Sequence, residues 1–235
     1  MASDVAYHKN KYERNFSKVI NLWGADHHGY VARIQAAIKM LGKKKDSLKI
    51  ILYQLVSLVR NGQPVAMSTR SGDFITLKDV LDEVGTDACR FFFLLRDSNS
   101  QLEFDLDLAK KQTSENPVFY VQYVNARCQS ILKNYDKDSS SADLSLLNTK
   151  EEKDLIKKLI SLEDTLLICA KTSSPHHLTT YLIETADIYH RFYEKCKVLQ
   201  ENKELEKARI QLLKAVSTVI KLGLDLLGVS APYKM

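Results

Sequence analysis

Residues 23–29, with the sequence WGADHHG, bring together side chains that could act on a nucleotide. The apolar residues 19–23 in front of Gly24 indicate a short buried strand that ends in a loop. Ligands of open α/β sheets bind at the carboxyl ends of strands, where a glycine lets a nucleotide approach the backbone. Asp26 is placed to accept hydrogen bonds from a ribose hydroxyl or an amine, and His27 and His28 lie beside it.

Two other interpretations of this segment stay open. Asp26, His27 and His28 also resemble the DHH motif of metal-dependent phosphoesterases, which would make the segment a metal site. Those enzymes need further Asp and His clusters as ligands, and we find none in the sequence, so we expect no protein-bound metal. The segment could also be a loop with a purely structural role.

A second candidate segment is PVAMSTRSG, residues 64–72, between an expected hairpin and an expected capped helix. Backbone donors, hydroxyl groups and the Arg70 guanidinium suit a polyphosphate, because they neutralise charge that develops during phosphoryl or nucleotidyl transfer. Taken alone, this pattern favours an ordinary surface loop.

Glycine placement divides the chain into an α/β part up to about residue 115 and an all-α part after it. Six of the eight glycines lie at or before Gly85, and the next is Gly223. Glycine supplies turns and helix ends, so frequent glycines suit alternating strands and helices. In the α/β part we expect strands at 19–23 and 49–60, a turn at Asn61-Gly62, and helices at 31–41, 76–85 and 87–96.

Four helices are expected in the all-α part, where they would form a bundle. Their starts carry cap signals such as Asn116-Pro117, the Thr149–Glu152 capping box and Ser174-Pro175. The polar segment 135–148 is expected to be an exposed loop. The expected helices span residues 116–134, 149–171, 174–196 and 204–227.

The composition is that of a soluble globular protein and excludes disordered and collagen-like chains, with 45% hydrophobic and 27% charged residues. The net charge of +5 permits a nucleic-acid partner without requiring one. No signal peptide and no apolar run long enough for a bilayer are visible, so we expect a cytoplasmic protein with no membrane partner. The four cysteines have no CxxC spacing and are expected to be reduced thiols.

Together, the two candidate segments resemble the second half of a class I aminoacyl-tRNA synthetase catalytic domain, with MSTRSG in the place of the KMSKS loop. Three longer runs are similar to arginyl-tRNA synthetases in particular: FDLDLAKKQTSENPVFYVQYVNAR, ADIYHRFYEKCKVL and GLDLLGVSAPYKM. The resemblance implies that residues 1–115 are the C-terminal half of a Rossmann-like catalytic domain. It implies a helical DALR-type anticodon-binding domain over residues 116–235.

The activity that this resemblance implies is arginine–tRNA ligation, in which ATP activates L-arginine and the arginine is transferred to tRNA-Arg. ATP with Mg²⁺, L-arginine and tRNA-Arg would be the substrates and partners. The sequence has no HIGH motif and begins inside the catalytic domain, and Ala66 and Thr69 replace the two motif lysines. We therefore expect a truncated fragment that is inactive alone, and the alternative function is a non-catalytic RNA-binding helical module.

The family's site residues are carried over by the resemblance to matching positions of this chain. The resemblance implies that Asp4 pairs with the arginine guanidinium and that His27 lies near the amino acid. ATP would be bound by Gly24, Asp26, His28 and Gly72. The catalytic loop would contribute Met67, Ser68, Thr69 and Arg70.

The aromatic residues of the helical part follow a helical spacing that is more typical of core residues than of base-stacking surfaces. We still expect some exposed aromatic side chains to stack on unpaired anticodon bases, since RNA loops are read in that way. The tail 229–235 adds an aromatic residue, a cation and an apolar end. The expected tRNA-binding residues are Tyr120, Tyr123, Asn125, Arg127 and Met235.

We expect a monomer, although a truncated α/β part would expose apolar surface that favours self-association.

Overall fold

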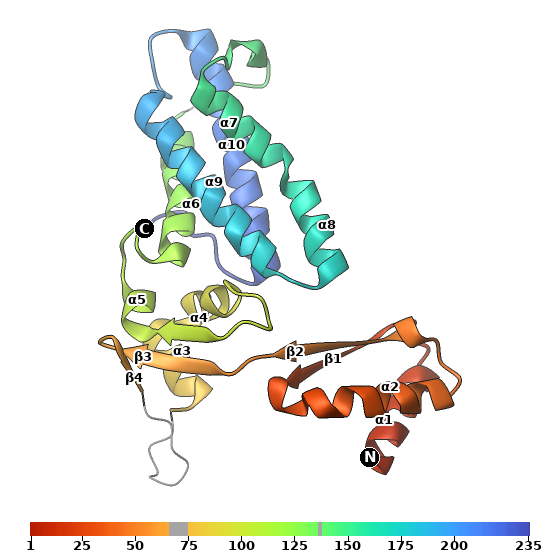
Figure 1. Ribbon diagram of the computed structural model, residues 1–235. Helices are drawn as coiled ribbons and strands as arrows, with labels where there is room; N and C mark the ends of the chain where they lie inside the picture. Colours follow the sequence, from red (N-terminus) through yellow and green to blue (C-terminus); the bar gives the residue numbers. More distant parts are fainter. Residues whose placement is uncertain (66–74, 136–137) are drawn as a thin grey trace. The chain divides into compact units, whose positions relative to one another are not determined.

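A computed structural model describes residues 1–65, 75–135 and 138–235 of the chain, with the side chain of residue 45 left out (Figure 1). The chain forms two compact units. The first unit comprises Met1–Ser57 and Ser98–Glu103, and the second comprises Leu58–Asp97 and Phe104–Met235. The units therefore do not divide at residue 115, because residues 58–97 and 104–115 pack with the helices that follow them.

The first unit is built on two parallel strands, β1 (Val19–Gly24) and β2 (Leu48–Tyr53), paired from Val19↔Leu48 to Gly24↔Tyr53. The crossover between them holds the 3-10 helix η1 (Ala25–Tyr30), helix α2 (Val31–Met40) and the 3-10 helix η2 (Lys45–Ser47). Gly42 follows α2 with φ +72°, as expected of a glycine that ends a helix. This part of the α/β prediction is confirmed.

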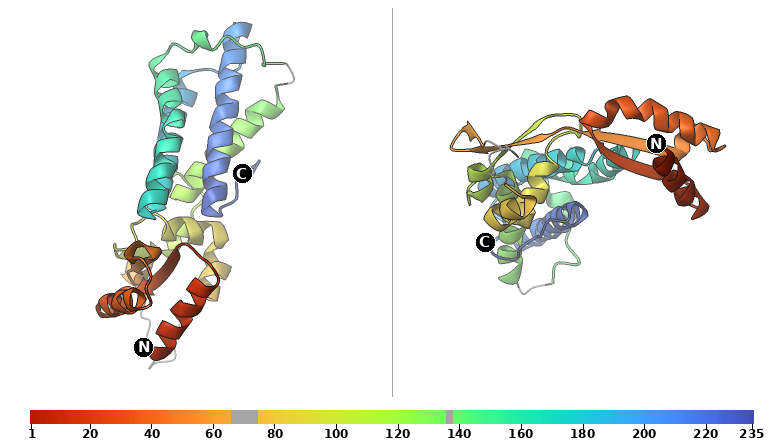
Figure 2. Two further views of the ribbon diagram at one scale, coloured as in Figure 1. Left: turned by 90° about the vertical axis from the view of Figure 1, so that its right-hand side faces the viewer. Right: turned by 90° about the horizontal axis from the view of Figure 1, so that it is seen from below.

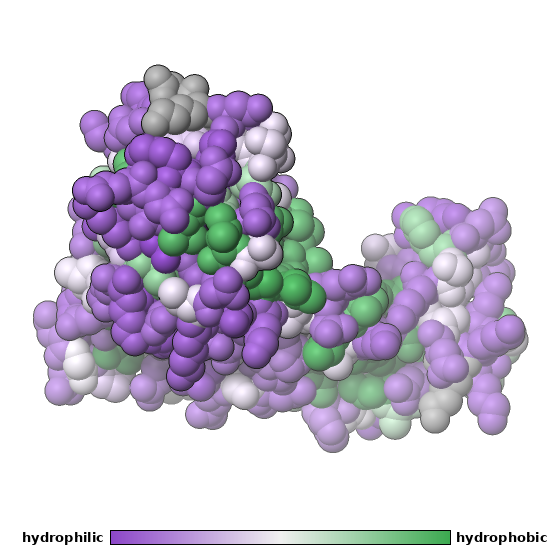
Figure 3. All heavy atoms as spheres, turned by 90° about the horizontal axis from the view of Figure 1, so that it is seen from above, coloured by the Kyte–Doolittle hydropathy of each residue, from purple (hydrophilic) through white to green (hydrophobic). Residues whose placement is uncertain are grey.

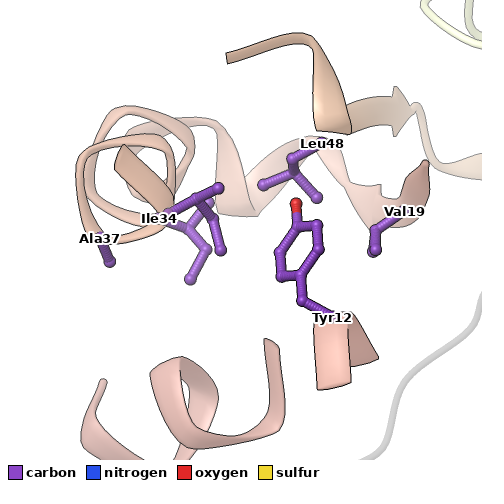
Figure 4. Packing of buried hydrophobic residues seen from close by; sticks show 6 residues of the cluster. Tyr12, Val19, Ile34, Ala37 and Leu48 are labelled. Atoms are coloured by element: carbon purple, nitrogen blue, oxygen red, sulfur yellow. The ribbon is translucent and has the colours of Figure 1, made fainter. Parts of the chain in front are cut away.

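Helix α1 (Ala2–Glu13) is an element that the sequence does not predict. Only His8 and Tyr12 are buried in it, so its apolar side is too narrow to give a clear helical pattern. Tyr12 joins a core cluster with residues of β1, β2 and α2, drawn in Figure 4. The buried members of that cluster are Tyr12, Val19, Ile34, Ala37, Ile38 and Leu48.

One face of the β1–β2 pair is covered by this cluster and the other is open. Val19 and Asn21 of β1 are buried, whereas Ile20 is 52% and Leu22 is 66% exposed. Strand side chains alternate between faces, and parallel sheets normally have both faces covered. Figure 3 shows apolar patches on an otherwise mostly hydrophilic surface. The exposed Ile20 and Leu22 side chains give the first unit an apolar face.

The three strands β3 (Val56–Arg60), β4 (Gln63–Pro64) and β5 (Leu102–Asp105) form a second small sheet in the order β4-β3-β5. The expected long strand 49–60 is thus two strands, interrupted at residues 54–55. Asn61 and Gly62 both have positive φ, as the predicted hairpin turn requires. Three short helices accompany this sheet in the chain: α3 (Leu77–Val84), α4 (Thr86–Phe93) and α5 (Leu106–Lys110).

A helical bundle forms the rest of the second unit. Helix α10 packs along α6, and α9 packs against α6, α7 and α8 (Figures 1 and 2). The expected helix 149–171 is two helices, because the chain bends at Ser161. The helices are α6 (Pro117–Lys133), α7 (Lys150–Ile160), α8 (Leu162–Thr172), α9 (His176–Lys195) and α10 (Lys203–Leu227), with the 3-10 helix η3 (Leu144–Leu146) before α7.

The predicted caps hold at Thr76, Asn116 and Thr149, each of which accepts a backbone N–H of its helix. The Ser174 prediction is wrong, because α9 begins after Pro175 and the Ser174 hydroxyl donates to Asp97. The 135–148 prediction needs correction at Ser139, which is buried and accepts hydrogen bonds from α10.

No helix of the described residues is both long enough and apolar enough to cross a membrane. The four cysteines are free thiols, as expected. Burial raises the pKa of the Cys128 thiol to about 12, so this thiol is a packing residue of the bundle and not a nucleophile.

Candidate nucleotide-binding strand end and RNA-binding helices

The predicted nucleotide-binding residues of the first unit lie on one turn at the carboxyl end of β1. Gly24 ends the strand, and Asp26, His27 and His28 follow on η1 with exposed side chains. His27 Nε2 lies 3.7 Å from Asp26 Oδ2. A Cβ on residue 24 would lie 2.5 Å from Asp26 Oδ1, so glycine lets this carboxylate fold back against the strand end. The turn therefore presents a carboxylate and two imidazoles to a ligand.

The aromatic rings of Trp23 and Tyr30 pack against each other beside this turn. The Trp23 ring centroid lies 5.7 Å from that of Tyr30 and 6.4 Å from that of His27. Partial burial raises the pKa of the Tyr30 hydroxyl, and the neighbouring Asp4 carboxylate raises that pKa further. The predicted arginine ligand Asp4 is thus brought from α1 to the group around η1, where its carboxylate is half-buried.

A buried histidine that the sequence analysis missed fixes α1 on β1. Asn21 Nδ2 donates to His8 Nε2 at 2.8 Å, so the other ring nitrogen, Nδ1, carries the proton and donates to the Asp4 carbonyl at 2.8 Å. Lys11 Nζ donates to Asn21 Oδ1 at 3.2 Å. The network holds the backbone of Asp4 against the strand that ends at Gly24. The sequence held one signal for this contact: His8 follows Asp4 by four residues, which is about one turn of a helix.

The predicted catalytic residues Met67, Ser68, Thr69 and Arg70, and the predicted ATP-binding Gly72, lie outside the described residues. Within the described ranges, no group of three or more His, Cys, Asp or Glu side chains could hold a metal ion. The DHH interpretation therefore gains no supporting ligand cluster from the described part of the chain.

In the second unit, the predicted RNA-binding residues of α6 meet aromatic residues of α9. The Tyr120 ring lies 4.7 Å from His190, and the Tyr123 ring stacks on His190 at 6.0 Å. The Arg127 guanidinium lies 5.4 Å from the Tyr123 ring and 4.7 Å from the Tyr193 ring. All five side chains are half-buried, so this cluster keeps ring edges and a cation at the surface.

Other aromatic residues at the same helical spacing belong to the core. Tyr189 and Phe192 are fully buried, which confirms the packing interpretation for these two. Tyr189 stacks on Tyr193 and so supports the cluster from inside.

Some polar groups of the cluster have hydrogen-bond partners and others have none within the described residues. The Tyr120 hydroxyl donates to Asp187 at 2.8 Å, and partial burial followed by this bond raises the pKa of Tyr120 to about 12. Burial lowers the pKa of His190, whose ring is therefore neutral at pH 7. His190 Nε2 and Arg127 Nε are buried and have no hydrogen-bond partner within the described part of the chain. A hollow of about 390 Å³ beside them is lined by Ser114, Phe119, Tyr120, Tyr123, His190 and Glu194.

Asn125, predicted to contact tRNA, holds the C-terminal tail. Its side chain is buried, and its Nδ2 donates to the carbonyls of Ala231 and Pro232 at 3.2 and 3.0 Å. Its Oδ1 accepts from the Ser217 hydroxyl at 2.8 Å. Because these bonds occupy the amide, its part in this conformation is to position the tail, and direct contact with RNA stays a prediction. Met235, at the end of that tail, is exposed.

Comparisons with known proteins show what the chain is similar to. Residues 121–235 match the family model of the DALR anticodon binding domain. Over its full length the chain is 50% identical to an arginine–tRNA ligase from Desulfosudis oleivorans and 51% identical to one from Citrifermentans bemidjiense. It spans 44% and 43% of the lengths of these two relatives, less than half of each.

Solved structures give the same relationship. The chain superposes over its full length on 51% of an arginyl-tRNA synthetase from Campylobacter jejuni, with a TM-score of 0.90 and 37% identity. An arginyl-tRNA synthetase from Thermus thermophilus, at 24% identity, shares the fold over 93% of this chain with a TM-score of 0.76. The chain is therefore homologous over its whole length to part of the arginyl-tRNA synthetases, and its residues 121–235 match the DALR anticodon binding domain.

Proposed function

We propose that the helical bundle binds the anticodon stem-loop of tRNA-Arg. The observation that carries this proposal is the Arg127 guanidinium lying over both the Tyr123 and the Tyr193 ring, on helices that match an anticodon binding domain. A cation and adjacent ring surfaces are what an unpaired RNA loop needs, because splayed bases stack on aromatic rings and phosphates pair with guanidinium. Tyr120 and the exposed Met235 would extend the same contact surface.

The charge of this region limits how strongly RNA is held. Residues 116–235 carry 17 basic and 15 acidic side chains, a net charge of +2. Few phosphates are then neutralised, so affinity depends on stacking and falls as salt rises. We expect dissociation constants of about micromolar or weaker, in the range of weakly specific RNA binding.

We further propose that the first unit contributes half of an arginine–tRNA ligase active site. Gly24, Asp26 and His28 would bind ATP with its Mg²⁺, and Asp4 and His27 would bind L-arginine, with residues 67–72 completing the site. The position of the Asp4 carboxylate beside the Tyr30 hydroxyl and the exposed η1 turn support these roles. Because the chain has no HIGH motif, we propose that it does not form arginyl-adenylate by itself. Like the activity, a cytoplasmic location is proposed from the relatives.

The experiment is a titration of a fluorescently labelled tRNA-Arg anticodon stem-loop with the full chain at low salt. Arg127→Ala should weaken binding about tenfold, the loss expected for one stacked and paired contact. Arg96→Ala removes the same charge at an exposed site outside the bundle and serves as the control. Equal binding by wild type and Arg127→Ala, or no binding by the wild type, would refute the proposal.

A further inference from the structure

The C-terminal tail is held by side chains of α4, a helix that precedes the matched anticodon binding domain. Ser230 is contacted at three atoms. Its N–H donates to Asp87 Oδ1 at 3.0 Å, its hydroxyl donates to Asp87 Oδ2, and its carbonyl accepts from Gln122 Nε2 at 2.9 Å. Gln122 Nε2 also donates to Asp87 Oδ2 at 2.9 Å. We call Asp87, Gln122 and Asn125 the tail clamp.

Arg90, one helical turn after Asp87, fixes the point where the tail leaves α10. Its Nε donates to the Leu227 carbonyl at 2.9 Å, which satisfies a carbonyl at the helix end and places a cation there. Gly228 turns the chain with φ +66°, and a Cβ at this position would lie 2.6 Å from Arg90 Nη2. Glycine at position 228 thus serves both the left-handed turn and the close approach of the arginine.

The clamp ends at Pro232, and the three residues beyond it lie at the surface. The Tyr233 side chain is 65% exposed, and Lys221 Nζ lies 6.0 Å from the centre of its ring. Tyr233 and Lys234 face the last turns of α6 across a hollow of about 520 Å³. The described lining of this hollow contains two lysines and no acidic side chain: Gln129, Ser130, Lys133, Asn134, Tyr233 and Lys234.

We propose that this hollow is a subsite for one unpaired RNA nucleotide, and that Asp87 is a positioning residue that builds it. The base would stack on Tyr233, and the phosphate would pair with Lys133 and Lys234. Amide and hydroxyl groups of Gln129, Ser130 and Asn134 offer hydrogen bonds to the base edge or the ribose. This inference rests on the proposed RNA binding of the bundle and names a contact additional to the Arg127 cluster.

Asp87 acts here only through the tail. Its carboxylate oxygens accept from Ser230 and Gln122, so it does not need to touch RNA. Removing it frees two donors of Ser230 and lets the last residues leave α6. The nucleotide subsite would then be lost although Tyr233, Lys133 and Lys234 are all still present.

The test is a double-mutant cycle on the full chain, using the labelled tRNA-Arg anticodon stem-loop as the probe. Asp87→Ala and a chain ending at Pro232 should each bind about tenfold more weakly than wild type, the loss of one stacked base. The two changes combined should bind no more weakly than the shortened chain. Asp82→Ala, an exposed carboxylate on α3, removes the same charge and should change nothing.

Two further measurements separate positioning from folding. Carboxypeptidase should remove the last three residues faster from Asp87→Ala than from wild type, at an unchanged thermal midpoint of unfolding. If Asp87→Ala does not fold, Ser230→Ala takes its place, and Ser230→Thr, which keeps the hydroxyl, should bind as wild type does. Lys133→Ala should lower the slope of log K against log salt by about one.

Distinct outcomes refute the two proposals. No RNA binding by the wild type overturns the proposed function and this subsite together. Binding that survives loss of residues 233–235 unchanged overturns the subsite and the contact proposed for Met235, and leaves the Arg127 site standing. Additive losses in the double variant, or equal carboxypeptidase rates, overturn the positioning role of Asp87.

Discussion

Arg209 Nε donates to Glu152 Oε1 at 2.7 Å, and both side chains are buried between α7 and α10. Glu152 Oε2 at the same time accepts the Thr149 backbone N–H at 2.8 Å, which completes the capping box at the start of α7. Arg209 Nη1 donates to the Lys197 carbonyl at 2.8 Å. One buried ion pair therefore ties the start of α7, the turn after α9 and the second turn of α10 together.

Breaking this pair from the cationic side should destabilise the bundle strongly. Arg209→Met leaves the Glu152 carboxylate buried without its partner, a change that costs about 3–5 kcal/mol in comparable cases. Urea unfolding followed by circular dichroism measures the loss. Arg191→Met, at an exposed position of α9, is the control, and an Arg209→Met chain as stable as this control would contradict the expectation.

Stability should fall on acidification partly through Glu152. Burial alone would raise the pKa of this carboxyl, but the Thr149 and Arg209 hydrogen bonds outweigh it and hold the pKa below the ordinary glutamate value. The ionised group therefore contributes stability at neutral pH, and that contribution is lost as the pH falls through the lowered pKa. Urea midpoints of wild type and Glu152→Gln should converge between neutral and strongly acidic pH. A difference in urea midpoint that stays constant with pH would contradict this contribution of Glu152.

Gly223 should resist enlargement because α9 and α10 approach closely there. A Cβ at position 223 would lie 2.6 Å from Leu182 Cδ2, inside the core, so Gly223→Ala should cost about 1–3 kcal/mol, as overpacking does. Gly29→Ala is the matched control, because nothing lies within 4 Å of its added Cβ and its φ is unstrained. Thermal unfolding of the two variants at equal concentration measures the loss of stability, and equal midpoints would contradict the expectation.

The chain alone should not catalyse arginine-dependent exchange of pyrophosphate into ATP. The HIGH motif of class I synthetases is absent from the sequence, and loss of preorganised charge stabilisation costs orders of magnitude in rate. Purified protein with ATP, Mg²⁺, L-arginine and labelled pyrophosphate provides the assay. Exchange clearly above a no-enzyme blank would show that residues 1–235 suffice for activation.

The open face of β1 should drive self-association of the first unit. Leu22→Glu places a charge where a 66% exposed leucine now lies, so the folded chain tolerates it while association weakens. Light scattering over a concentration series should show a smaller apparent mass for this variant than for wild type. Leu167→Glu, on the exposed side of α8, controls for added charge. A monomeric wild type at every concentration would contradict the expectation.

Local signals in the sequence predicted most elements of the fold. The Thr149 capping box, the Asn116-Pro117 start and the Asn61-Gly62 turn are set by residues a few positions apart, and the structure contains all three. Helix α1 and the bend at Ser161 were missed, because neither carries a strong amphipathic pattern or a breaker residue.

Long-range contacts explain what the sequence could not show about the site. Tyr120, Tyr123 and Arg127 were predicted from their own helix, but their partners His190 and Tyr193 lie on another helix. The contact of Asp87 with Ser230 joins positions 143 residues apart, and nothing local marks either one.

The tail clamp also fixes how long α10 can be. Each residue inserted into an α-helix advances its end by about 1.5 Å and rotates it by about 100°. One added residue would therefore carry Ser230 to another side of the helix, away from Asp87, and would take Gly228 from the Arg90 side chain. Changes in chain length are expected to be excluded between Lys203 and Leu227. The length of α10 therefore sets the distance from the far end of the bundle to the tail.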